Sequence, residues 1–132
     1  MKLSFSCSSP GKARWKQLSQ QHCGYCVPCL IRRAAMHKAF GDDGTVYTET
    51  SIYEMQNKNA EGMGIQLRSF QYAIDKIKQD RNRALFYIHK PGPLPQDDEY
   101  LRKLADTYIR GLLEVDAFIQ DNLAQEDENN DL

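Results

Sequence analysis

The sequence has no acidic residue between Met1 and Gly41. All 18 Asp and Glu residues lie beyond Gly41, although the whole chain has a net charge of −1. It also has no hydrophobic run long enough to span a membrane, and its N-terminus lacks the apolar core of a signal peptide. These absences argue against a membrane or secreted protein. We therefore expect a cytoplasmic protein whose thiols stay reduced.

A phosphate-binding loop is also missing. The glycines, including Gly62 and Gly64, match no nucleotide-binding fingerprint, and no strand–loop–helix series precedes the cysteines. His37 and His89 have no Ser, Cys or carboxylate pattern that would form a nucleophile–base pair. We therefore expect no catalytic residue in this chain, and we expect both histidines to be packing or surface residues.

Cysteine is scarce but clustered. Three of the 4 cysteines, Cys23, Cys26 and Cys29, are spaced as Cys-x-x-Cys-x-x-Cys, and Cys7 lies upstream. A Zn²⁺ ion takes four thiolates in a tetrahedron, and two cysteines two residues apart can hold one ion from a single turn. With all four bound, no position remains for an activated water. The pattern therefore predicts a structural zinc site rather than a catalytic one.

Other states of these cysteines stay open at this point. Two disulfides would require an oxidising compartment. An iron–sulfur cluster also uses repeated two-residue spacings, but the Cys-Pro that continues the bacterial ferredoxin motif does not follow Cys29. Free or redox-active thiols are a further alternative. His22 precedes Cys23 directly, and a histidine beside a complete four-cysteine set more often contacts a ligand or solvent than the ion itself.

The hydrophobic pattern predicts a mainly α fold with little or no strand, in which a small four-cysteine zinc knuckle is followed by a helical bundle. Pro28 opens a helix that meets no breaker until Gly41. Further helices are expected where apolar residues recur at three- and four-residue intervals or form a short run: 67–77, 101–119 and 84–88. The β-branched residues of 45–50 predict a short extended segment or an ordered loop.

These elements divide the chain into three regions. Residues 1–41 hold the zinc knuckle and the first helix, and a turn at 41–44 leads into the helical region 42–123. Residues 124–132 form an acidic segment with few apolar side chains, which predicts a disordered tail.

The basic N-terminal third contains a short segment, residues 12–16, in which Trp15 is interleaved with Lys12, Arg14 and Lys16. Aromatic and basic side chains in this order are typical of nucleic-acid contacts. The competing interpretation, which we favour, is a solvated loop whose Trp15 packs against the knuckle. Part of the positive charge also compensates the metal site, because an ion held by four thiolates carries about two negative charges.

The cysteine motif resembles the C-terminal zinc region of the 7-cyano-7-deazaguanine synthases, the QueC family of queuosine biosynthesis. That region typically contains Ser-Cys, a variable insert and then Cys-Gly-x-Cys-x-x-Cys-x-x-Arg. Here Ser6-Cys7 and Cys23 through Arg32 match it, over roughly the first third of the chain. The longer insert, the Arg32-Arg33-Ala34-Ala35 continuation and the helical extension look more like QatC, the QueC-like component of a bacterial anti-phage defence system.

The resemblance implies a set of roles. Cys7, Cys23, Cys26 and Cys29 would bind structural zinc, and Arg32 would face the substrate in the active-site cleft or compensate the metal charge. The family consists of ATP-dependent enzymes whose ATP-binding domain carries a Ser-Gly-Gly-x-Asp-Ser loop, which this sequence lacks. We therefore expect a C-terminal part that is not catalytic alone. Its expected partners are a QueC-like ATPase domain or other defence-system proteins. A free-standing zinc module that binds nucleic acid or protein is the alternative.

Overall fold

The computed structural model describes residues 5–41, 44–57 and 62–131 of the chain. This part is mainly helical, which confirms the predicted fold class. The helices are α1 (Lys12–Trp15), α2 (Val27–Phe40), α3 (Ile52–Asn57), α4 (Met63–Gln79), α5 (Arg83–Tyr87) and α6 (Asp98–Asn130). Extended pairing within these ranges is limited to one parallel bridge between His22 and Tyr47. The predicted turn at 41–44 lies partly outside the described residues.

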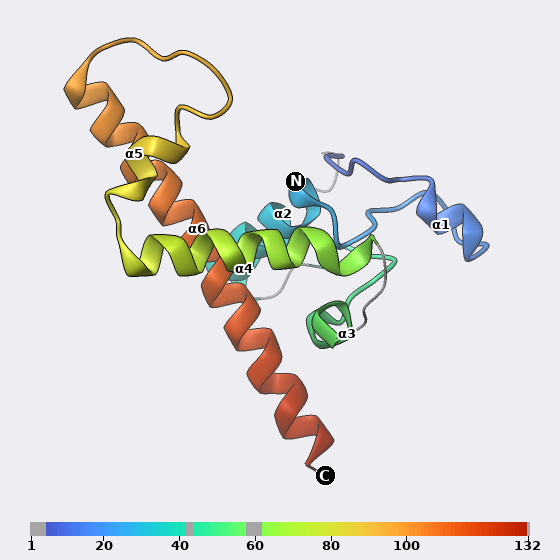
Figure 1. Ribbon diagram of the computed structural model, residues 1–132. Helices are drawn as coiled ribbons and strands as arrows, with labels where there is room; N and C mark the ends of the chain where they lie inside the picture. The colour runs from blue at the N-terminus through green and yellow to red at the C-terminus, as the bar shows by residue number, and fades with distance from the viewer. Residues whose placement is uncertain (1–4, 42–43, 58–61, 132) are drawn as a thin grey trace.

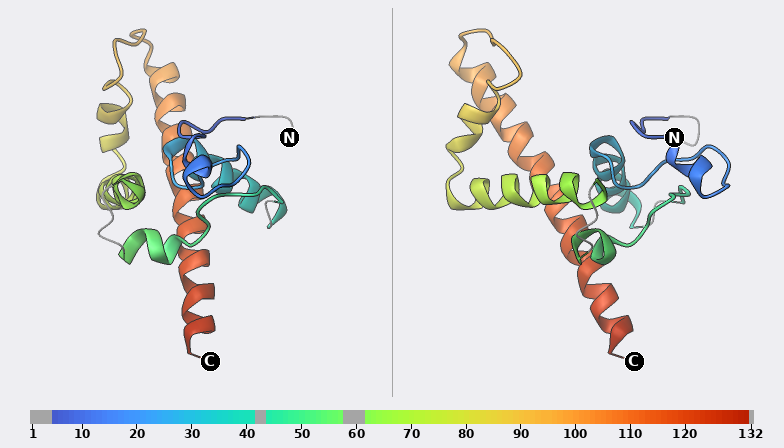
Figure 2. Two further views of the ribbon diagram at one scale, coloured as in Figure 1. Left: turned by 90° about the vertical axis from the view of Figure 1, so that its right-hand side faces the viewer. Right: turned by 45° about the vertical axis from the view of Figure 1, so that its right-hand side comes forward.

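The long helix α6 is the element against which α2, α3, α4 and α5 pack (Figure 1). Asp97 begins this helix as its N-cap, since its carboxylate accepts hydrogen bonds from the backbone N–H groups of Glu99 (3.0 Å) and Tyr100 (3.2 Å). Helix α1 and its flanking loops extend away from α6 on the other side of α2 (Figure 2). None of the described helices combines the length and the apolar character that crossing a bilayer requires.

One hydrophobic core joins the cysteine-rich segment to the long helix. Leu30 of α2, Leu67 of α4 and Ile119 of α6 are almost completely buried, and they belong to the same cluster as the three cysteines of the Cys-x-x-Cys-x-x-Cys run. Helix α2 packs directly on α6. The cysteine-rich segment and the helical bundle therefore share one core.

The helices predicted from apolar periodicity are present. Helix α4 buries Leu67, Ile74 and Ile77 along one face while Tyr72 on the opposite face is exposed. The short run at 84–88 forms α5 and one following residue, with Ala84 buried against the core. The apolar stripe of 101–119 lies on α6, as expected.

The C-terminal segment differs from its prediction. Residues 124–130, expected to be a disordered acidic tail, continue α6. A long-range contact accompanies this continuation: one carboxylate oxygen of Glu126 accepts hydrogen bonds from the Ser51 hydroxyl (3.1 Å) and from the Tyr53 backbone N–H (3.0 Å). Glu126 thus caps the N-terminus of α3 from another helix, and this contact gives the last turns of α6 a partner in the fold.

Replacing Glu126 by Ala is expected to lower the free energy of unfolding by about 1 kcal/mol, the usual loss when a helix cap is removed. Urea unfolding followed by circular dichroism measures the change. Glu128→Ala is the matched control, because Glu128 is an exposed carboxylate on the same helical end. Equal losses in the two variants would contradict the capping role of Glu126.

Candidate metal centre

The four cysteine sulfurs converge on one point. Each lies within 4.8 Å of every other, and the Sγ atoms are separated by 3.9 Å for Cys23–Cys29 and by 4.0 Å for Cys7–Cys26. Four sulfurs about 2.3 Å from a central ion form a tetrahedron with edges of about 3.8 Å. A disulfide would need sulfurs about 2.05 Å apart. The cluster therefore has the spacing of a metal site, and its four cysteines are free of disulfides.

The start of α2 positions two of these sulfurs. Cys26 is the N-cap residue of α2, and Pro28 occupies the first helical turn with Cys29 immediately after it. The Cys26 carbonyl accepts the backbone N–H of Leu30 (2.9 Å), which closes this turn. The positive end of the helix dipole therefore faces the cluster, and it favours the thiolate form that binds metal.

Cys7 joins the cluster from a separate segment. It is partly exposed, whereas the other three cysteines have no exposed surface. Its sulfur accepts backbone N–H groups from Ser9 and from Cys23, both at 3.3 Å. These bonds bring the N-terminal segment onto the knuckle and stabilise negative charge on the sulfur.

Interactions between the sulfurs shift their pKa values. The hydrogen bond between the Cys23 and Cys29 side chains lowers the pKa of Cys23 to about 4, and the same bond together with burial raises the pKa of Cys29. Burial also raises the pKa of Cys7. The shift at Cys23 is toward the thiolate, which is the form that binds a metal ion.

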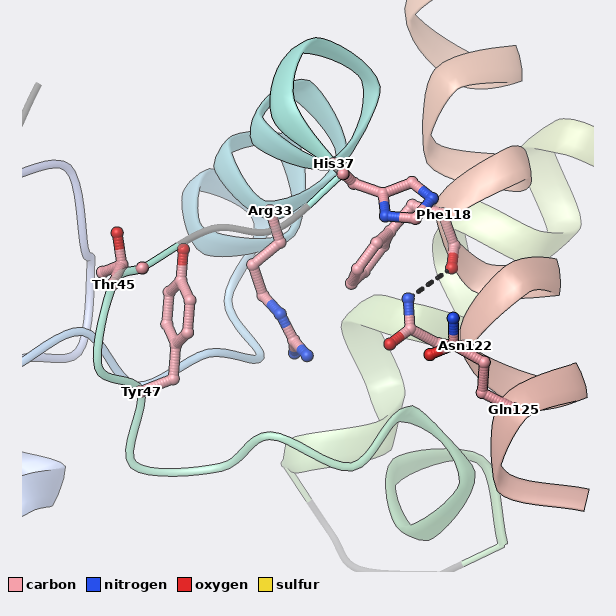
Figure 3. A pocket seen from close by; sticks show the side chains of 9 residues that line it. Arg33, His37, Thr45, Tyr47, Phe118, Asn122 and Gln125 are labelled. Carbon is pink, nitrogen blue, oxygen red and sulfur yellow. Dashed lines mark hydrogen bonds between the residues drawn. The ribbon is translucent and has the colours of Figure 1, made fainter. Parts of the chain in front are cut away.

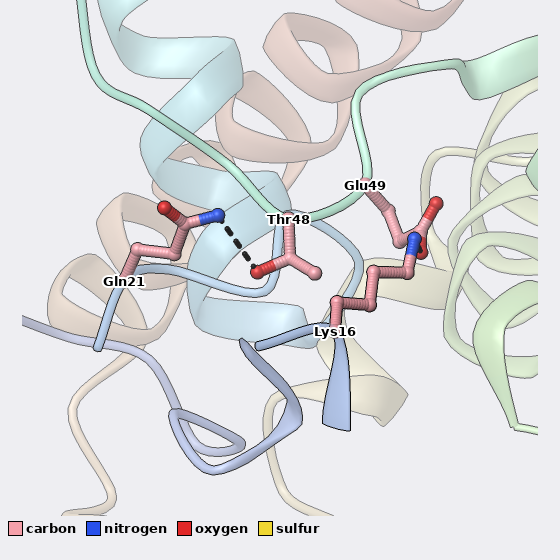
Figure 4. A network of polar contacts seen from close by, with 4 residues as sticks. All are labelled: Lys16, Gln21, Thr48 and Glu49. Atoms are coloured by element: carbon pink, nitrogen blue, oxygen red, sulfur yellow. Dashed lines mark hydrogen bonds and ion pairs between the residues drawn. The ribbon is translucent and has the colours of Figure 1, made fainter. Parts of the chain in front are cut away.

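Residues 48 and 49 lie across the knuckle as a strap. The backbone N–H of Thr48 donates to the His22 carbonyl, and that of Glu49 donates to the Cys23 carbonyl, both at 2.9 Å. Side chains add to this pairing, since Gln21 donates to the Thr48 hydroxyl (3.1 Å) and Lys16 pairs with Glu49 (Figure 4). The segment predicted as extended or ordered loop is thus an ordered strap that lies against the cysteine-rich segment.

His22 is buried next to the cysteine cluster and contacts Cys29. It is 6% exposed, and its Nδ1 lies 3.7 Å from the Cys29 sulfur, while its ring packs against those of Phe5 and Tyr47. An imidazole in this position orients a cysteine sulfur and excludes water from it. His22 therefore contacts one of the four cysteines, and the four sulfurs lie close together without any atom of His22 among them.

The two arginines after the cysteines have different surroundings. Arg32, the predicted substrate-facing residue, is only partly buried on α2. Arg33 is 7% exposed, and its guanidinium donates to the carbonyls of Gly24 (3.0 Å) and Thr50 (2.5 Å). No role was expected for Arg33 from the sequence. Its spacing from Cys29, four residues along a helix, places both residues on one face and was the signal for its burial.

The predicted packing of Trp15 against the knuckle is wrong. Its side chain is 87% exposed on α1. Ala13 is the residue of this helix that is buried, so α1 turns its small side chain inward and its indole outward. Lys12 and Arg14 are exposed beside it, and the aromatic and basic side chains therefore share one accessible surface.

Comparisons of the chain with protein-family models, with curated proteins and with solved structures find no match. The resemblance to the QueC family thus depends on the cysteine motif and its continuation to Arg32.

Proposed function

We propose that the chain is a zinc-stabilised C-terminal domain of a QueC-like, and more closely QatC-like, ATP-dependent enzyme of deazaguanine chemistry or anti-phage defence. The observation that carries the proposal is the convergence of the four cysteine sulfurs at the start of α2. The motif that supplies these sulfurs is the one by which the chain resembles the QueC family.

Zinc is the ion that we propose for this donor set. Four thiolates in a closed tetrahedron are typical of structural Zn²⁺ sites, and Cys7, Cys23, Cys26 and Cys29 would hold the ion. The ion would supply no catalysis in such a site, because its coordination is complete. It would instead fix α2 against the N-terminal segment, which a small core alone stabilises only weakly.

Arg32 is the residue through which this domain would reach a substrate. It follows Cys29 by three residues on α2, so the metal knuckle fixes its position, and its side chain is partly accessible. In the proposed assembly the ATP-binding domain is a partner. Arg32 would then face the cleft of that domain and contact an anionic substrate group.

The purified chain is expected to consume no ATP on its own. Phosphate or pyrophosphate release is measured with and without an added QueC-like ATP-binding domain, and complex formation is measured by native mass spectrometry. Binding to that domain, weakened by Cys26→Ser but not by Ser8→Ala, is the expected result. ATP turnover by the isolated chain, or the lack of any complex with the domain, would contradict the proposal.

Nucleic-acid binding is a second candidate, and the exposure of Trp15 favours it. A base can stack on an indole that is 87% exposed while Lys12 and Arg14 attract the phosphate backbone. Lys16 is already engaged, because it pairs with Glu49.

Trp15 is the single tryptophan of the chain, so tryptophan fluorescence reports binding directly. Titration with a single-stranded oligonucleotide is expected to quench it, with an affinity that falls steeply as salt rises. Trp15→Ala, followed by fluorescence anisotropy of a labelled oligonucleotide, should cost about 1–3 kcal/mol of binding free energy. Phe86→Ala is the control, because Phe86 is an exposed aromatic on α5. Unquenched fluorescence at low salt would exclude this second function.

A further inference from the structure

The four cysteines of the candidate metal centre differ in their access to solvent. Cys23, Cys26 and Cys29 have no exposed surface, whereas Cys7 is partly exposed. Oxidation of a cysteine requires the thiolate form and access to the oxidant, and a bound zinc ion keeps its cysteine ligands deprotonated. An oxidant that approaches the centre from solvent therefore meets Cys7 first.

The buried cysteines are held in place by the rest of the fold. Arg33 donates a hydrogen bond to the carbonyl of Gly24 (3.0 Å), the residue directly after the first buried cysteine. The Arg33 guanidinium lies 5.2 Å from the centre of the Tyr47 ring and 5.0 Å from that of Phe118 on α6 (Figure 3). These contacts tie the cysteine loop to α6. The third buried cysteine lies within α2 itself.

Cys7, in contrast, lies in an irregular segment that precedes α1. Its sulfur is 4.0 Å from that of Cys26, and a disulfide needs about 2.05 Å. A shift of the irregular segment can close this gap, whereas Cys26 is fixed as the N-cap of α2. Cys23 and Cys29 form the other close pair, with their sulfurs 3.9 Å apart. Cys7 and Cys26 are thus the pair that can form a disulfide with the least displacement of the core.

We propose that Cys7 is an oxidation site through which a hydroperoxide opens the metal centre, with Cys26 as the resolving cysteine. The inference rests on the zinc site of the proposed function. The Cys7 sulfur attacks one oxygen of the peroxide, so that an S–O bond forms, the O–O bond breaks and hydroxide leaves. The Cys26 sulfur then attacks the Cys7 sulfur, so that the S–S bond forms, the S–O bond breaks and a second hydroxide leaves. The two thiolates lose two electrons, and the peroxide is reduced to two hydroxide ions, which take protons from solvent.

Loss of the ion follows from this reaction. Cys23 and Cys29 remain as thiolates, and two ligands do not complete a structural zinc site. One zinc ion is therefore released for each peroxide consumed, and the disulfide joins the N-terminal segment to the N-cap of α2 in place of the ion. A thiol reductant reverses the disulfide by exchange, after which Zn²⁺ can bind again. Metal occupancy of the knuckle thus depends on the redox state of the solution.

Zinc release and disulfide mapping on the full, zinc-loaded chain test this site. The protein is treated with up to one equivalent of hydrogen peroxide, and the released Zn²⁺ is measured with a chromophoric chelator. The remaining thiols are alkylated before peptide mass spectrometry. We expect one zinc ion released per peroxide, a disulfide between Cys7 and Cys26, and alkyl groups on Cys23 and Cys29. A first disulfide of any other pairing, or zinc retained in an excess of peroxide, would overturn the proposal.

A variant and a labelling experiment isolate the role of Cys7. Cys7→Ser is expected to release zinc more slowly than the parent protein at the same peroxide concentration, and Ser8→Ala, which changes the exposed neighbour, should match the parent. If Cys7→Ser holds no zinc, limited alkylation of the parent protein by N-ethylmaleimide decides, because Cys7 should be modified before the buried cysteines. Equal modification of all four cysteines would contradict the proposal.

Failure of the zinc site and failure of this inference have different signatures. A protein that binds no zinc would contradict the proposed metal site, and the disulfide pairing of the reduced, metal-free chain would then still be read by mass spectrometry. A first disulfide between Cys7 and Cys26 in that chain would support Cys7 as the oxidation site. Any other first pairing would overturn it.

Discussion

Removal of the proposed zinc ion is expected to unfold the protein. Cys23, Cys26 and Cys29 are fully buried in the same core cluster as the apolar residues of α2, α4 and α6. Binding of a structural zinc ion contributes about 10–16 kcal/mol, which equals or exceeds the whole stability of a typical domain, about 5–15 kcal/mol. Addition of a strong chelator should therefore abolish the cooperative urea transition seen by circular dichroism, and added Zn²⁺ should restore it.

Substitutions of the ligands should reproduce this loss. Cys26→Ser removes a buried ligand that also forms the N-cap of α2, and we expect no cooperative transition in this variant. Cys7→Ser should be milder, because Cys7 is partly exposed and lies on a separate segment. Ser8→Ala, next to Cys7 but outside the cluster, is the control. A chelator-treated protein with an unchanged urea midpoint would show that the metal does not stabilise this fold.

Gly24→Ala is expected to be the most damaging substitution outside the cysteines. Gly24 has a φ of +91°, a left-handed conformation that costs other residues about 1–2 kcal/mol. A Cβ atom there would also overlap the carbonyl oxygen of Glu49, so the strap would have to leave the knuckle. The Glu49–Cys23 backbone bond, 2.9 Å long, would then be lost. We expect a total loss of about 3–5 kcal/mol in urea unfolding, and weaker zinc binding in competition with a chromophoric chelator.

Gly111→Ala is the matched control for this substitution. Gly111 is exposed within α6, and a Cβ atom built there meets no other atom within 4 Å. Since alanine is the better helix former, this variant should be about 0.5–1 kcal/mol more stable than the parent protein. If Gly24→Ala retained the parent's stability and zinc affinity, the close contact between the knuckle and the strap would be refuted.

The cysteine cluster and the main helices could be predicted because local sequence determines them. The spacing of Cys23, Cys26 and Cys29, followed by a breaker-free helix, already requires three sulfurs near one turn. The apolar stripes of α4 and α6 likewise follow from helical periodicity alone.

The features that sequence reasoning missed depend on contacts between distant segments. The rotation of α2 against α6 decides that Arg33, rather than Arg32, is buried. Glu126 acquires its role from α3, more than 70 residues earlier in the chain, and acidic composition alone indicated a disordered tail. Trp15 lies in a short helix flanked by irregular loops, where no periodic pattern indicates which side chain points inward.

The metal itself tests the central claim most directly. The protein is purified without oxygen, its metal content is determined by mass spectrometry, and the ligands are counted by X-ray absorption. The account predicts one zinc ion per chain, bound by four sulfurs at about 2.3 Å, with no visible absorption. Iron with visible absorption would show that the cysteines hold an iron–sulfur centre and not a structural zinc ion. A protein without metal would also contradict the account.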